Sequence, residues 1–191
     1  MSFSVRTAFA AALGAGLLAT QALAAPPAWT VDKAASKLAF KSSFSGMPFE
    51  GAFQRWDAQI AFDPKDLGAS KVNVTIQTGS ARTGDGNRDE SMPSDDWFAA
   101  RKFPTATFTA ASFKSLGGNR YEADGTLTIR GVSKPVALPF TLDIAGDVAK
   151  MNGQVAINRT AFGVGQGEFA GPESVPLEVT VVVAITAHKA G

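Results

Sequence analysis

Apolar and polar side chains alternate with a period of two over most of the chain beyond residue 36. This spacing predicts β-strands, because successive side chains of a strand point to opposite faces. The alternation is clearest over 121–130, 136–144 and 175–187, where apolar residues occupy most alternate positions. Glycine, asparagine and aspartate separate the segments, as in Gly117-Gly118-Asn119 and Gly146-Asp147, and these residues favour tight turns. Connections this short join consecutive strands in antiparallel pairs.

About eight such segments follow one another, so the sequence predicts an all-β fold of eight antiparallel strands. These strands either stack as a sandwich or close into a barrel, and an eight-stranded barrel is filled by its own side chains or holds one small ligand. The alternation changes parity within 49–62, which predicts one strand with a bulge. A second strand, 148–159, is expected to be interrupted at Asn152-Gly153.

A long polar segment, 79–103, breaks the alternation and predicts a short helical insert between strands. Ser94 is a suitable N-cap, and Asp95 and Asp96 would lie in the first turn, where the helix dipole favours anions. Pro104 would end the helix. A connection of this length inside a compact domain is usually functional, for example as a lid.

The first 25 residues are predicted to be a cleaved signal peptide, followed by one domain over 26–191. Arg6 precedes an apolar run over 7–20, and Ala22-Leu23-Ala24 supplies the small residues that signal peptidase reads, so cleavage is expected after Ala24 or Ala25. The run is shorter than the roughly 20 residues that span a bilayer. We therefore expect the mature protein to be exported.

The amino-acid composition limits the kinds of functional site and partner that this chain can have. The chain has no cysteine, which excludes disulfides, zinc–cysteine sites and thiol nucleophiles. Its 18 Lys and Arg against 17 Asp and Glu offer no bulk charge for nucleic acid. The 14 Phe supply apolar surface for a core or a pocket. The segment 85–89 imitates the start of a calcium loop, but Glu90 stands where that loop needs glycine, so a solvated loop is expected.

The sequence contains no catalytic or metal-binding constellation. His188, the one histidine, lies in the C-terminal tail, where neither a metal site nor a Ser-His-Asp arrangement is expected. The adjacent acids Asp89-Glu90 and Asp95-Asp96 fall on the polar insert, where such pairs are usually solvated. We therefore expect a protein that is not an enzyme and carries no cofactor.

The segment LTIRGVSKPVALPF, 127–140, resembles the signature of the YceI-like family. Four further stretches agree with that family in order and spacing: WTVD at 29–32, GAFQRWDAQIAFDPKDL at 51–67, NRDESMPSDDWFAARKFPTATF at 87–108 and INRTAFGVG at 157–165. The resemblance implies a periplasmic, polyisoprenoid-binding, lipocalin-like barrel. Many members carry histidines where this chain has Ala35 and Phe44, so any role of those histidines is absent here.

The sequence also resembles the subgroup of YceI-like proteins that accompany b-type cytochromes. That resemblance implies a quinone or other prenyl lipid as cargo and a membrane b-type cytochrome as a partner. A homodimer is a further implication, because family members are often dimeric.

The resemblance implies an elongated apolar tunnel inside the barrel. The expected ligand-binding residues are Leu38, Phe40, Phe44, Phe53, Ile76, Trp97, Phe98, Phe108, Leu127, Phe140, Arg159 and Phe162. Arg159 faces either a polar head group or a structural ion pair, and we favour the structural role. Two alternatives stay open: an enzyme that acts on the lipid, and a solid barrel that serves as an envelope stress or interaction module.

Overall fold

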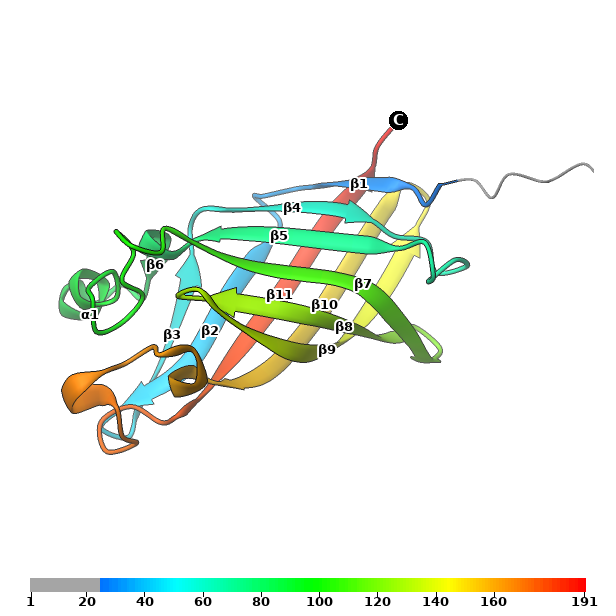
Figure 1. The fold of residues 1–191 in the computed structure, drawn as a ribbon. Helices are drawn as coiled ribbons and strands as arrows, with labels where there is room; N and C mark the ends of the chain where they lie inside the picture. Colours follow the sequence, from blue (N-terminus) through cyan, green and yellow to red (C-terminus); the bar gives the residue numbers. More distant parts are fainter. Residues whose placement is uncertain (1–24) are drawn as a thin grey trace, which may run out of the picture.

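The computed structural model describes residues 25–191, which form one antiparallel sheet that closes on itself (Figure 1). The predicted signal peptide lies outside the described residues, apart from Ala25. The strands are β1 (Ala28–Val31), β2 (Lys37–Phe44), β3 (Met47–Phe53), β4 (Trp56–Ala61), β5 (Lys71–Gln77), β6 (Ala81–Arg82), β7 (Thr105–Gly117), β8 (Arg120–Ile129), β9 (Val132–Ala145), β10 (Val148–Asn158) and β11 (Glu178–Lys189). Among these residues, no helix has the length and apolar composition needed to cross a bilayer.

The barrel has eight strand positions, as the sequence predicts. Its hydrogen-bonded order is β1-β4-β5-β7-β8-β9-β10-β11, and β11 pairs again with β1. The strands β2 and β3 continue the positions of β1 and β4, because β2 pairs with β11 as β1 does and β3 pairs with β2. All pairings are antiparallel, which confirms the predicted fold class.

Side chains hold the chain together where β1 gives way to β2. The carboxylate of Asp32 accepts hydrogen bonds from the backbone N–H groups of Ala34 and Ala35, which forms a local turn. Ser36 Oγ then accepts from the N–H of Thr186 at 3.0 Å and donates to its carbonyl at 3.2 Å. A serine hydroxyl thus replaces backbone pairing across the gap.

Two details of the strand prediction were wrong. The parity change within 49–62 is not a bulge, because the chain leaves its partners at Phe53 and starts again at Trp56 with new ones. The N–H groups of Gln54 and Arg55 donate instead to the carbonyl and hydroxyl oxygens of Ser80. The strand β10 is continuous, since Gly153 pairs with both Phe140 and Val183.

The helical insert exists, but its helix begins earlier than predicted. The helix α1 (Gly86–Ser91) is capped by Asp85, whose carboxylate accepts from the N–H of Arg88 at 3.0 Å. The segment that starts at Ser94 forms turns, and Ala99 adopts a left-handed backbone with φ of 45°, which stops helical propagation. In Figure 1, α1 and the segment 159–177 (orange) lie at the same end of the barrel.

Candidate functional site

The barrel interior holds a cavity of about 660 Å³. Ten of the strands contribute to its wall, and nearly all of the lining side chains are apolar. Small-molecule pockets fall between about 300 and 1,000 Å³ and share this mostly apolar character. The barrel is therefore not filled by its own side chains.

Two inward-facing phenylalanines leave the centre free because the ring of each lies over a glycine of a neighbouring strand. A Cβ atom on Gly51 would lie 2.3 Å from the ring of Phe40, and one on Gly125 would lie 2.4 Å from the ring of Phe108. Aromatic rings that cover glycines in this way lie along the sheet and stabilise it.

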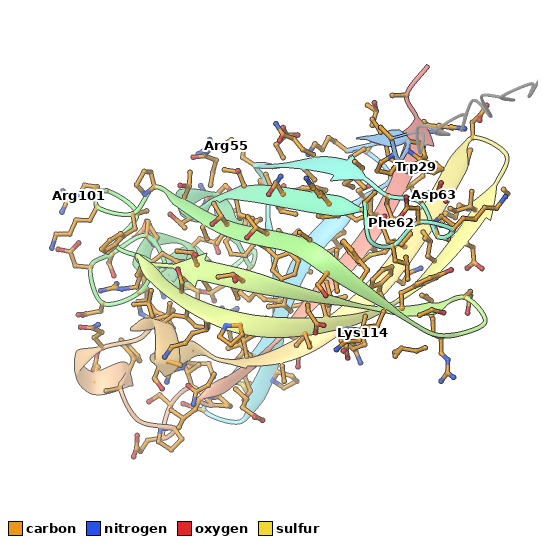
Figure 2. The ribbon with its side chains drawn as sticks, turned by 45° about the vertical axis from the view of Figure 1, so that its right-hand side comes forward. Trp29, Arg55, Phe62, Asp63, Arg101 and Lys114 are labelled. Carbon is orange, nitrogen blue, oxygen red and sulfur yellow. The ribbon has the colours of Figure 1, made fainter. Side chains whose placement is uncertain are left out.

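An aromatic cluster lies at one end of the cavity. The ring of Phe62 lies 5.2 Å from that of Phe113, 5.8 Å from that of Tyr121 and 6.2 Å from that of Phe140, in edge-to-face arrangements that such rings prefer. Trp29 Nε1 donates a buried hydrogen bond of 2.9 Å to the carbonyl of Phe62, which holds the cluster to β1. Figure 2 shows Trp29 and Phe62 at the end of the barrel opposite Arg101.

The other end is a mouth formed by the β2–β3 hairpin and α1. Phe44 and Met47 line the cavity there, yet they are 38% and 68% exposed. Arg88 of α1 lies over the ring of Phe49, with its guanidinium carbon 4.8 Å from the ring centroid, and forms an ion pair of 3.6 Å with Asp85. The mouth therefore joins an apolar interior to a polar rim.

Arg159 fixes the segment that flanks the mouth. Its guanidinium donates to the carbonyls of Val164, Gly165, Gly171, Val175 and Pro176 at 2.8–3.4 Å. These five bonds match the five N–H donors of the group. Burial, to 3% exposure, lowers the pKa of Arg159, but an arginine of this kind stays charged in proteins.

Arg159 therefore has the structural role that we favoured, although its partners are carbonyls and not the expected ion pair. The guanidinium carbon also lies 5.6 Å from the centroid of Trp97, a further lining residue. All the residues that we predicted for the lining contribute to the cavity wall except Phe162: Leu38, Phe40, Phe44, Phe53, Ile76, Trp97, Phe98, Phe108, Leu127, Phe140 and Arg159.

Phe162 was predicted to line the cavity, but it does not. It lies in a 3-10 helix, Arg159–Phe162, and is 3% exposed in a buried cluster that also contains Ile129 and Val164. The sequence places Phe162 next to a glycine-rich loop but does not indicate to which side that loop folds.

Several lining residues were missed by the sequence analysis. Phe113 faces the cavity because the pairing of β7 with β8 shifts between Ala110 and Ser112, and this irregularity inverts the side-chain alternation. Phe62 follows β4 directly and keeps the parity of Ile60, so its alternation was visible in the sequence. The α1 residues Asn87 and Arg88 were missed because the helix was placed too late.

The cavity wall has few side chains that could act as acids, bases or metal ligands. Its titratable side chains are Asp85, Arg88 and Arg159, all of which already have partners. Within 25–191, no three histidine or carboxylate side chains gather as metal ligands. The calcium-like segment is used differently, since Asp85 caps α1.

Acid is expected to loosen the insert through Asp89. Burial alone would raise the pKa of Asp89. Its carboxylate, however, accepts hydrogen bonds from the N–H and the hydroxyl of Thr83, at 2.6 and 2.8 Å. These bonds, the Gly84 backbone and the charge of Arg82 together lower the pKa of Asp89 below 3.8. A lowered pKa means that this tie stabilises the fold above pH 3.8 and is lost as the pH falls through the folded-state value. An NMR titration of the Thr83 amide should show a midpoint below 3.8. Asp89→Asn should abolish that titration, and a midpoint at or above the ordinary value would contradict the expectation.

Taken together, the eight-position antiparallel barrel and its apolar cavity define a lipocalin-like barrel of the ligand-holding kind. The chain belongs to the YceI-like family, since the YceI-like domain matches residues 29–187.

Relatives of known sequence and structure agree with this assignment. The UPF0312 protein of Pseudomonas savastanoi pv. phaseolicola is 34% identical over 182 residues, covering 90% of this chain and 92% of that protein. Protein YceI of Salmonella arizonae is 42% identical over 97 residues, covering 51% of this chain and 50% of that protein. The crystal structure of BcnA from Burkholderia cenocepacia has a TM-score of 0.79 and 35% identity, covering 82% of this chain and 98% of that chain.

A more distant structure shares the fold. A polyisoprenoid binding domain from Saccharophagus degradans has a TM-score of 0.68 at 16% identity, covering 86% of this chain and 99% of that chain. At this identity the likeness concerns the fold alone.

Proposed function

We propose that this protein is a periplasmic binding protein or carrier that encloses a long isoprenoid lipid of the polyprenyl or quinone type. The observation that carries the proposal is the apolar cavity of about 660 Å³ that runs from the aromatic end to the mouth. Each buried CH₂ of a ligand stabilises binding by about 0.8 kcal/mol, so a few isoprene units outweigh an association cost of about 4–15 kcal/mol. The polyisoprenoid binding described for the Saccharophagus degradans domain supports the same ligand class.

Lipid binding explains the apolar cavity better than the two alternatives, a solid barrel and an enzyme that acts on the lipid. A solid barrel is inconsistent with the cavity. Catalysis would need free polar groups at the ligand, but Asp95 and Asp96 do not line the cavity and the donors of Arg159 are occupied by carbonyls. Activity that depends on these three residues would favour an enzyme.

The lipid itself is the test of this proposal. Protein purified from an exporting bacterial host should release an isoprenoid into organic solvent, identified by mass spectrometry. An unrelated periplasmic protein purified in parallel is the control for carried-over membrane lipid. An extract with no isoprenoid above that control would contradict the proposal.

Export and partners are separate parts of the proposal. Osmotic shock should release a protein whose N-terminus lies at Ala25 or Pro26, the positions after the predicted cleavage sites.

A membrane b-type cytochrome is the proposed partner, supported by the subgroup resemblance, and crosslinking in the native membrane tests it. Light scattering of the purified protein tests the homodimer.

A further inference from the structure

Among the strand residues that line the cavity, Ser42 alone has a polar side chain. Ser42 of β2 follows Leu38 and Phe40 on the inward face, and Phe44 comes next toward the mouth. Its hydroxyl oxygen is buried and has no hydrogen-bond partner among the described residues. A buried hydroxyl without a partner is unfavourable, so a bound molecule that supplies an oxygen here gains a hydrogen bond.

The surroundings of Ser42 place it where an elongated ligand would end. Across the β2–β3 pair its partner is Phe49, the residue whose ring lies under Arg88. The polar rim and the buried hydroxyl therefore flank one aromatic ring near the mouth. At the opposite end, the members of the aromatic cluster that line the cavity are Phe62, Phe113 and Phe140, which offer only apolar surface to the ligand.

The charges at this end favour an uncharged ligand group. Arg88 and Asp85 form an ion pair, so their charges largely cancel. Arg159 has no N–H left for an anion, because five carbonyl contacts occupy its donors. A phosphate or diphosphate would therefore lose its hydration beside a guanidinium whose charge Asp85 already balances and which would also bring the anion close to the Asp85 carboxylate.

We propose that Ser42 is the polar anchor of the cavity and that it binds an uncharged oxygen, a hydroxyl or carbonyl, at the head of the isoprenoid. This inference rests on the proposed lipid-binding function and adds the class of head group to it. The head would lie between Ser42 and the rim, and the prenyl chain would extend toward the aromatic cluster.

The test compares three probes with the same prenyl skeleton: an alcohol, a diphosphate and a hydrocarbon without oxygen. Their affinities are measured by competition against a fluorescent apolar ligand. For Ser42→Ala we expect about 2- to 10-fold weaker binding of the alcohol and unchanged binding of the hydrocarbon. Ser42→Thr keeps the hydroxyl and should retain the affinity. Ser43→Ala is the matched control, because Ser43 is the next residue of β2 and does not line the cavity.

The wild-type protein should bind the diphosphate no more tightly than the alcohol. An equal effect of Ser42→Ala on the alcohol and the hydrocarbon would overturn the anchor, since that would indicate packing. An unchanged alcohol affinity, or tenfold tighter binding of the diphosphate, would overturn it as well. Failure of all three probes to bind the wild-type protein would reject the proposed function itself, and the anchor with it.

Discussion

Gly51→Ala is expected to weaken isoprenoid binding by roughly 50-fold. The three atoms nearest to the new methyl group would all belong to the ring of Phe40, at 2.3–2.9 Å, so this ring must move. The ring of Phe53 lies 5.5 Å from that of Phe40, which limits movement along the wall and directs the ring toward the lumen. If the displaced ring takes the place of about three methylenes at ~0.8 kcal/mol each, binding loses about 2.4 kcal/mol.

The measurement is a titration with a long prenyl alcohol. Adding Phe40→Leu to Gly51→Ala should restore most of the affinity, because the smaller side chain leaves room for the methyl group. Gly68→Ala is the control, since its Cβ atom would meet only Asp66 at an ordinary 3.7 Å. An unchanged affinity for Gly51→Ala, or a loss that Phe40→Leu does not reverse, would contradict the explanation.

Arg159→Met is expected to lower the free energy of unfolding by about 3 kcal/mol or more. The substitution keeps an unbranched side chain but removes every donor to the five carbonyls of the segment 164–176. Each buried acceptor that is left without a partner costs about 1–3 kcal/mol, and water can reach only some of them. Urea unfolding followed by circular dichroism gives the value.

Two further variants separate this effect from charge alone. Arg159→Lys keeps the charge but has three donors, so it should lie between the wild type and Arg159→Met. Arg55→Met removes an exposed arginine (Figure 2) and should change stability by no more than about 0.5 kcal/mol. Equal stabilities of Arg159→Lys and the wild type would show that charge, and not the set of hydrogen bonds, decides the stability.

Much of the fold was predictable because strand alternation is a local property. Residues of one face recur at every second position, so Leu38, Phe40 and Phe44 were assigned to the cavity wall before their partners were known. The same holds for Ile76, Leu127 and the other predicted residues that line the cavity. Turn residues marked most of the connections, and their short lengths determined antiparallel pairing.

Predictions failed where the local sequence was compatible with more than one structure. Asp85 and Ser94 are both good N-caps, and only the turns that follow Ser94 show that the helix uses Asp85. The parity change after Phe53 fits a bulge as well as a change of partners. Phe162 depends on the path of a loop, to which periodicity does not apply.

The sequence by itself determined an all-β chain of eight antiparallel strand positions, an apolar inward face and a polar insert. Whether that inward face encloses space was decided only in three dimensions. The pairs Phe40 with Gly51 and Phe108 with Gly125 come from different strands, and register alone brings each ring over its glycine. The cavity exists because these rings lie along the wall, and a one-residue shift in register would turn them to the other face of the sheet.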